Sequence, residues 1–107
     1  MGRILILEPQ PEVRELFVRV AARLGHAALT EIDDETESPP DAIVLAPEDP
    51  VGLSVVRSLH GSFPDVPIVC TSILPRGPET RDLAPVAYLT KPFALADLER
   101  VLTDALA

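Results

Sequence analysis

Short apolar runs alternate with amphipathic stretches along the chain. Most of these runs are continuous, without the polar residue at every second position that marks a half-exposed strand. Continuity of this kind is typical of strands buried on both faces of a parallel sheet. The pattern predicts strands over Arg3–Leu7, Ala27–Ile32, Asp41–Ala46, Ile68–Thr71 and Val86–Leu89. The run over Ala27–Ile32 is the least apolar and is expected at an edge of the sheet.

Between the runs, apolar residues recur at helical spacing. This periodicity predicts helices from about Pro11 to Leu24, from Pro50 to about His60, and over the stretch that carries Leu95 to Leu106. Asp49 is placed to cap the second of these helices. Gly25 and Gly61 are placed to end the first and the second.

Two connections carry little helical signal. The acidic segment Asp33–Pro40 leaves room for at most one helical turn. The proline-rich segment Ser72–Pro85 allows a helix only over Glu79–Leu83. Strands that alternate with helices in this way predict a three-layer α/β domain, doubly wound around a parallel sheet, that occupies residues 1–107.

Composition narrows the class of protein further. The chain has 107 residues, 47% of them hydrophobic and only 4% aromatic, which suits one domain with an aliphatic core. No apolar run approaches the length of a membrane span. The net charge of −8 disfavours nucleic-acid binding, which needs a basic face. We therefore expect a cytoplasmic protein that binds neither nucleic acid nor membrane.

The candidate site lies where the buried strands end. In parallel sheets, ligands and chemistry are found just beyond the carboxyl ends of the strands. At the carboxyl end of the third predicted strand stands Ala46. It carries only a methyl group, so this position can do no chemistry.

Enzyme templates fit the chain badly. The turn Glu8–Pro11 contains no glycine that would let a backbone approach a pyrophosphate. There is no phosphate-binding loop of the Walker type and no Gly-x-Ser-x-Gly sequence. His26 and His60 are far apart and are expected near helix ends and the surface, not as metal ligands. Cys70 is the only cysteine, so it forms no internal disulfide, and it is expected to be buried and chemically inert.

Several segments together carry a family resemblance. The segment Tyr88–Phe93 contains Lys-Pro-Phe after the fifth strand, Pro40–Leu45 leads to Ala46, and Thr71 follows the apolar residues of the fourth strand. In this order and spacing they resemble the response-regulator receiver domain family (CheY-like), over essentially the whole chain. The resemblance implies sheet order 2-1-3-4-5 in a flavodoxin-like fold. It also implies that the second helix of the family is short or missing here.

The resemblance implies what an active member of the family does. An aspartate that ends the third strand accepts a phosphoryl group, and Mg²⁺ bridges it to an acidic pair after the first strand. Here Ala46 stands at the acceptor position, and Pro9 stands where a second acid is expected. The chain is therefore expected to be a degenerate receiver, with Glu8, Pro9, Ala46, Thr71 and Lys91 at the positions of the lost phospho-site. No Mg²⁺ or other cofactor is expected.

The sheet order that the resemblance implies places Glu8, Ala46, Thr71 and Lys91 around one shallow cleft. The residues of this cleft that still carry polar groups have structural interpretations. Glu8 is expected to pair with Lys91 across the cleft instead of binding a metal. Thr71 is expected to end its strand with a local hydrogen bond. The resemblance suggests a cis peptide bond between Lys91 and Pro92, and it offers Tyr88 as the family's rotating aromatic, although an ordinary partly exposed strand residue fits equally well. By the same resemblance, Tyr88, Pro92 and the final helix form the interaction surface.

The leading hypothesis is a non-catalytic signalling module of a two-component or phosphorelay-type system. It acts by protein–protein contact, without phosphorylation at Ala46, on a partner such as a kinase, an output domain or a second copy. One rival is a phospho-accepting regulator that uses Glu48 or Asp49 as a displaced acceptor. Another is a sensor that holds an anion or metabolite near Thr71 and Lys91.

Overall fold

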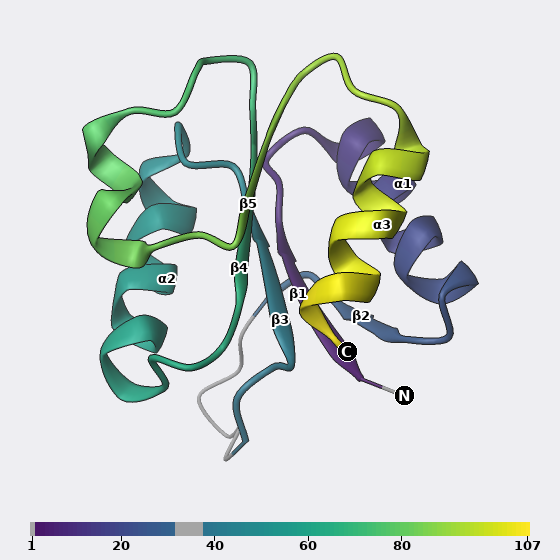
Figure 1. Cartoon of the computed structure of the whole chain (residues 1–107), viewed down its shortest axis with the longest axis horizontal. Coiled ribbons are helices and arrows are strands. Elements are labelled where there is room, and N and C mark those ends of the chain that lie inside the picture. The colour runs from purple at the N-terminus through teal and green to yellow at the C-terminus, as the bar shows by residue number, and fades with distance from the viewer. Residues whose placement is uncertain (1, 32–37) are drawn as a thin grey trace.

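The structure is a computed structural model that describes residues 2–31 and 38–107 (Figure 1). Its centre is a five-stranded parallel sheet with the order β2-β1-β3-β4-β5. The strands are β1 (Arg3–Leu7), β2 (Ala27–Leu29), β3 (Ala42–Leu45), β4 (Ile68–Ser72) and β5 (Ala87–Thr90). The connecting helices are α1 (Pro11–Arg23), α2 (Pro50–Ser62), the 3₁₀ helix η1 (Pro78–Leu83) and α3 (Leu95–Ala105). The predicted three-layer α/β fold and its strand order are confirmed.

The two faces of the sheet are covered by different helices (Figure 1). Ile4 and Ile6 of β1 pack into a core with α1 and α3, whereas Leu5 packs into a second core with α2 and η1. Successive side chains of a strand point to opposite faces, and here both faces are buried. This explains why β3 is apolar at every position and why the apolar residues of β1 and β4 run on without a polar residue between them.

Element boundaries differ from the prediction by one to three residues. β2 is shorter than predicted, and β4 reaches Ser72 where the sequence suggested Thr71. Helix α2 continues through Gly61, so the predicted stop there is wrong. The helix ends because Phe63, with φ −135° and ψ 72°, precedes Pro64, and the residue before a proline is disfavoured in helical conformation.

The connection between β2 and β3 holds no helix over residues 30–31 and 38–41. The expectation of a short or missing second helix otherwise falls on residues 32–37, which lie outside the described residues. The short helix predicted over Glu79–Leu83 is present as η1. Among the helices that the structure describes, none has the length and apolar character that crossing a membrane requires.

The residues that the sequence assigned to structural roles largely have them. Gly25 adopts φ 85° directly after α1, a left-handed conformation that glycine adopts without strain, so its role in ending that helix is confirmed. Cys70 is fully buried, as predicted. His26 is half-buried and its Nδ1 accepts a hydrogen bond from the Gly2 backbone N–H at 2.9 Å, which ties the start of β1 to the segment before β2. His60 is half-buried in α2.

Candidate functional site

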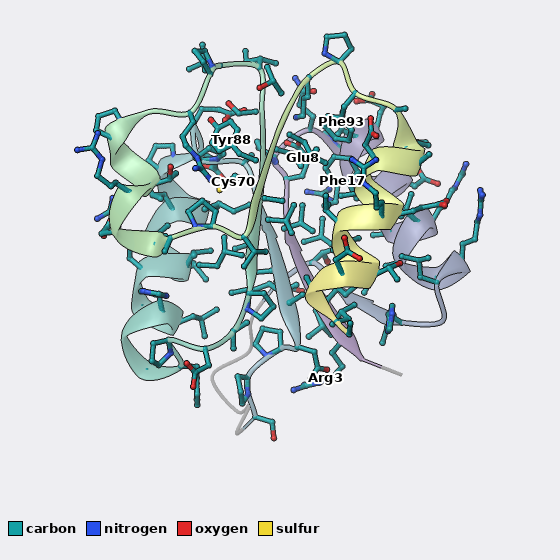
Figure 2. The ribbon with its side chains drawn as sticks, viewed as in Figure 1. Arg3, Glu8, Phe17, Cys70, Tyr88 and Phe93 are labelled. Atoms are coloured by element: carbon teal, nitrogen blue, oxygen red, sulfur yellow. The ribbon has the colours of Figure 1, made fainter. Side chains whose placement is uncertain are left out.

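Strand register brings the predicted site residues to one edge of the sheet. Leu7 pairs with Leu45, and Ser72 pairs with Thr90. Glu8 and Ala46 directly follow the first pair, and Lys91 directly follows the second. Figure 2 shows Glu8 at this end of the sheet, between the helical layer of α2 and that of α1 and α3.

Glu8, which is buried, and Lys91, which is partly buried, form an ion pair between the ends of β1 and β5. The Lys91 Nζ donates to Glu8 Oε1, and the other carboxylate oxygen accepts a hydrogen bond from the Gln10 backbone N–H at 3.3 Å. The side chain of Glu8 is 2% exposed and that of Lys91 is 18% exposed. The predicted pairing is confirmed, as is the cis bond between Lys91 and Pro92.

Ala46 directly follows β3, next to the end of β1 that carries Glu8, and is fully buried. Its backbone N–H donates to the Leu7 carbonyl at 3.1 Å, and its carbonyl accepts from the Asp49 N–H at 3.0 Å. Both bonds are made by the backbone, so they fix the position without depending on the side chain. The side chain of this position is a methyl group and adds no polar atom to the site.

The residues at the cleft do not fit Mg²⁺. A hard cation of this kind takes several oxygen ligands in near-octahedral geometry. Glu8 is the single acid that directly follows β1, and both of its carboxylate oxygens already accept hydrogen bonds. The side chains of Pro9 and Ala46 have no ligand atom, and the Ala46 carbonyl accepts from the Asp49 N–H. Residues 2–31 and 38–107 contain no cluster of three or more histidine, cysteine or acidic residues suited to a metal ion.

The hydroxyl that ends β4 belongs to Ser72, a residue that the sequence interpretation passed over. Its Oγ donates to Glu48 Oε2 at 2.8 Å and accepts from the Leu74 N–H at 3.0 Å. Thr71 is fully buried, and within the described part of the chain its Oγ1 has no hydrogen-bond partner. The expectation that Thr71 ends the strand with a local hydrogen bond is therefore wrong.

The alternation of side chains along β4 explains why Ser72 makes these hydrogen bonds and Thr71 does not. Val69 packs on the side of α1 and α3, whereas Cys70 packs on the side of α2. Thr71 follows the direction of Val69 and Ser72 that of Cys70. Glu48 lies in the loop that leads to α2, so it meets Ser72 and not Thr71. The assignment of Thr71 to the degenerate phospho-site stays a prediction, with Ser72 as the alternative hydroxyl.

The two acids of the displaced-acceptor hypothesis are engaged in local contacts. The Asp49 carboxylate accepts from the backbone N–H groups of Val51 and Gly52, each at 3.3 Å, so the predicted cap of α2 is confirmed. Glu48 is exposed and accepts the hydrogen bond from Ser72. Neither acid occupies the position that follows a strand.

Asp49→Ala should lower the free energy of unfolding by about 1 kcal/mol, because the first turn of α2 loses its side-chain acceptor. Asp49→Ser keeps an oxygen at this position and should retain most of the stability. Urea unfolding of both variants measures the difference. If Asp49→Ala unfolded like the parent chain, Asp49 would not be acting as a helix cap.

The side chain of Tyr88 contacts the loop that follows β4. Its hydroxyl lies 3.2 Å from the Leu74 carbonyl oxygen and 3.4 Å from that of Pro75, both of which accept hydrogen bonds from it. Together with Ser72, this makes a continuous chain of contacts from Glu48 through Ser72 and Leu74 to Tyr88. Tyr88 is half-buried and Pro92 is exposed.

No protein-family model matches the chain, and no curated protein sequence matches it. Solved structures do match it over nearly its full length. The chemotaxis protein CheY4 of Vibrio cholerae has a TM-score of 0.82 at 19% identity, with 99% of both chains covered. The receiver domain of the Pseudomonas aeruginosa sensor histidine kinase PA1611, with magnesium in its active-site cleft, has a TM-score of 0.79 at 23% identity, covering 98% of this chain and 97% of that one.

A third similar structure is the response regulator TrrA of Thermotoga maritima in complex with magnesium and beryllofluoride. Its TM-score is 0.75 at 23% identity, with 99% of this chain and 100% of that chain covered. At these identities the likeness establishes the fold. The fold is that of CheY-like response-regulator receiver domains, as the sequence pattern suggested.

Proposed function

We propose that this chain is a single receiver-like domain of a two-component or phosphorelay-type system that signals by protein–protein contact, without phosphorylation at Ala46. The observation that carries this proposal is the partly buried ion pair of Glu8 and Lys91 beside a fully buried alanine. Acyl-phosphate chemistry needs a carboxylate nucleophile at the end of β3. Here a methyl group takes that place, and the neighbouring acid and lysine bind one another.

The residues at the cleft also distinguish this chain from its structural neighbours. The PA1611 receiver holds magnesium in its cleft, and TrrA holds magnesium with beryllofluoride. Receiver domains with this fold are generally signalling modules, not enzymes. We propose that this chain keeps that role without the metal, because Pro9 and Ala46 offer no ligand atoms where a metal site would need them.

The proposed contact surface is formed by Tyr88, Pro92 and α3. The Tyr88 hydroxyl donates a hydrogen bond to the loop after β4. Pro92 follows the cis peptide bond and is exposed. The partner is a protein such as a kinase or an output domain, or a second copy of the chain. The net charge of −8 disfavours nucleic acid, and the proposed setting is the cytoplasm.

The two rival functions have less support. A displaced acceptor would need Glu48 or Asp49 to leave the contacts with Ser72 and with the start of α2. An anion sensor at the cleft would need Lys91 to leave Glu8, and Thr71 to turn out of a fully buried position. Each requires breaking a contact before any ligand is gained.

The proposal is tested by adding beryllofluoride and Mg²⁺ while recording amide NMR spectra. We expect no saturable shift at Glu8, Ala46, Ser72 or Lys91. The TrrA receiver, whose structure holds these ions, serves as the positive control. Saturable shifts of these amides at stoichiometric beryllofluoride would contradict the proposal.

Ser72→Ala should change the environment of Tyr88, because the hydroxyl that holds the Leu74 N–H is removed while Tyr88 bonds the Leu74 carbonyl. The expected loss of stability is about 1 kcal/mol. The chain has one tyrosine and no tryptophan, so its intrinsic fluorescence reports Tyr88 alone. Ser54→Ala, at an exposed position of α2, is the matched control and should leave the fluorescence unchanged. Unchanged fluorescence in Ser72→Ala would show that the contacts do not couple the cleft to Tyr88.

A further inference from the structure

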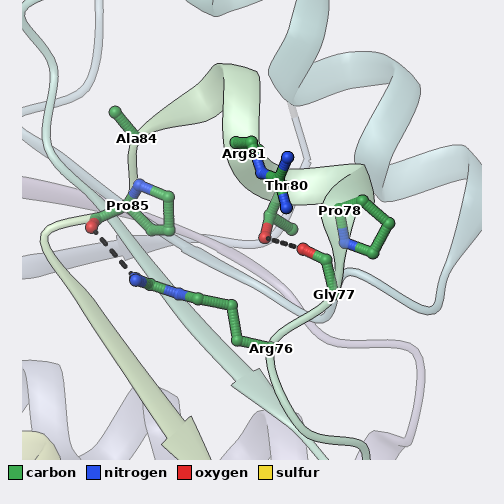
Figure 3. Close-up of a pocket in the computed structure, with 7 residues that line it drawn as sticks. All are labelled: Arg76, Gly77, Pro78, Thr80, Arg81, Ala84 and Pro85. Atoms are coloured by element: carbon green, nitrogen blue, oxygen red, sulfur yellow. Dashed lines mark hydrogen bonds between the residues drawn. The ribbon is translucent and has the colours of Figure 1, made fainter.

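A cavity of about 500 Å³ opens beside η1, and none of its lining residues belongs to the cleft (Figure 3). It is formed by the end of the loop after β4, by η1 and by the residues that lead into β5. Its volume lies within the range of about 300 to 1,000 Å³ that is usual for small-molecule sites. Pro78, Ala84 and Pro85 supply apolar wall, and Arg76 and Arg81 supply positive charge.

Arg76 and Arg81 are the charged side chains among the described residues that line the cavity. The protein has 9 lysine and arginine residues against 17 acidic residues. Among the side chains that the structure describes, Arg76 and Arg81 form no salt bridge, and the neighbouring acid Asp82 pairs with Arg57 at 3.1 Å. Guanidinium groups bind phosphate and carboxylate oxygens through paired N–H donors. The cavity is therefore suited to an anion.

The walls of the cavity are held in place by contacts within the protein. Thr80 is fully buried, and its hydroxyl donates to the Gly77 carbonyl at 3.4 Å. Arg76 donates to the Pro85 carbonyl at 3.4 Å, and its guanidinium carbon lies 5.6 Å from the centre of the Tyr88 ring (Figure 3 shows the first of these contacts). A site that is already ordered costs less to occupy than one that must be ordered on binding.

We propose that this cavity binds a small organic molecule that carries a phosphate group. Arg76 and Arg81 bind the phosphate oxygens, and the apolar wall of Pro78, Ala84 and Pro85 contacts the body of the molecule. Arg76 lies between the cavity and Tyr88, so an occupant changes the surroundings of the tyrosine ring. This site is independent of the cleft at Ala46, and its failure would leave the proposed function untouched.

The test is a titration with glucose 6-phosphate, inorganic phosphate and glucose at constant ionic strength, followed by calorimetry and by Tyr88 fluorescence. We expect saturable binding of glucose 6-phosphate, several-fold weaker binding of inorganic phosphate, and none of glucose. Arg76→Gln and Arg81→Gln should each weaken the binding of glucose 6-phosphate about tenfold, as loss of a charged hydrogen bond does. Arg19→Gln, which removes an exposed arginine of α1, should change nothing.

Calorimetry is the readout for the variants, because Arg76→Gln also alters the ring environment of Tyr88. No saturable heat with either phosphate compound would overturn the proposal. Equal weakening by Arg19→Gln would overturn it too, since the effect would then be one of net charge. Equal affinity for inorganic phosphate and glucose 6-phosphate would overturn the assignment to an organic ligand.

Discussion

Replacing Lys91 by methionine should lower the free energy of unfolding by about 3 kcal/mol, because it leaves a buried carboxylate without its cation. The Glu8 side chain is 2% exposed, so water cannot take the place of the ammonium group. Methionine preserves most of the length and the apolar stem of lysine, so packing changes little. Urea unfolding monitored by circular dichroism measures the loss.

The double variant Glu8→Gln with Lys91→Met is the matched control. It removes both charges, and it should recover most of the lost stability, since the cost lies in the unpaired charge and not in the missing contact. A loss below about 1 kcal/mol in Lys91→Met would place the pair in the range of exposed ion pairs. The ion pair of Glu8 and Lys91 would then contribute little to the stability of this end of the sheet.

Ala46→Asp should also be strongly destabilising, by on the order of 2 to 4 kcal/mol, because it buries a second carboxylate beside Glu8. Among the described residues, Lys91 is the one cation that bonds to the Glu8 carboxylate, since Arg14 reaches only the Glu8 backbone carbonyl. One ammonium group cannot neutralise two acids. Two neighbouring carboxylates are, however, the start of a magnesium site. Added Mg²⁺ should therefore raise the melting temperature of Ala46→Asp while leaving that of the parent chain unchanged.

Ala46→Asn is the control for this experiment. It has the same shape without the charge, so it should cost less stability and show no response to Mg²⁺. Thermal unfolding of all three proteins at several Mg²⁺ concentrations shows whether Mg²⁺ raises the melting temperature of Ala46→Asp alone. A concentration-dependent stabilisation of the parent chain would show that Glu8 holds a metal without any help from position 46.

The fold could be predicted because its signals are local. β1, β3 and β4 are buried on both faces, so each carries an unbroken run of apolar residues, and the amphipathic stretches between them have helical period. The edge strands were predicted less well. Val86 bonds to Ile68 from outside β5, a contact that depends on the neighbouring strand and not on the sequence of β5 itself.

The site was only partly predictable, because some of its contacts depend on strand pairing and on how η1 packs. Ala46 could be placed from the end of its predicted strand, whereas Glu8 and Lys91 were placed by the family resemblance. Thr71 and Ser72 are adjacent hydroxyl residues, and only the pairing of Ser72 with Thr90 decides which of them ends β4. The cavity with Arg76 and Arg81 depends on how η1 packs, and the proline-rich sequence of this segment carries no periodic signal that would place it.

The most direct test of a phosphorylation-silent cleft is the intact mass of the chain after incubation with acetyl phosphate and Mg²⁺. The unmodified mass should persist, with no fraction that carries an added phosphoryl group. A stoichiometric phosphoryl adduct that maps to Glu48 or Asp49, and that is lost when both acids are substituted, would contradict the proposed function and make the chain a working receiver with a displaced acceptor.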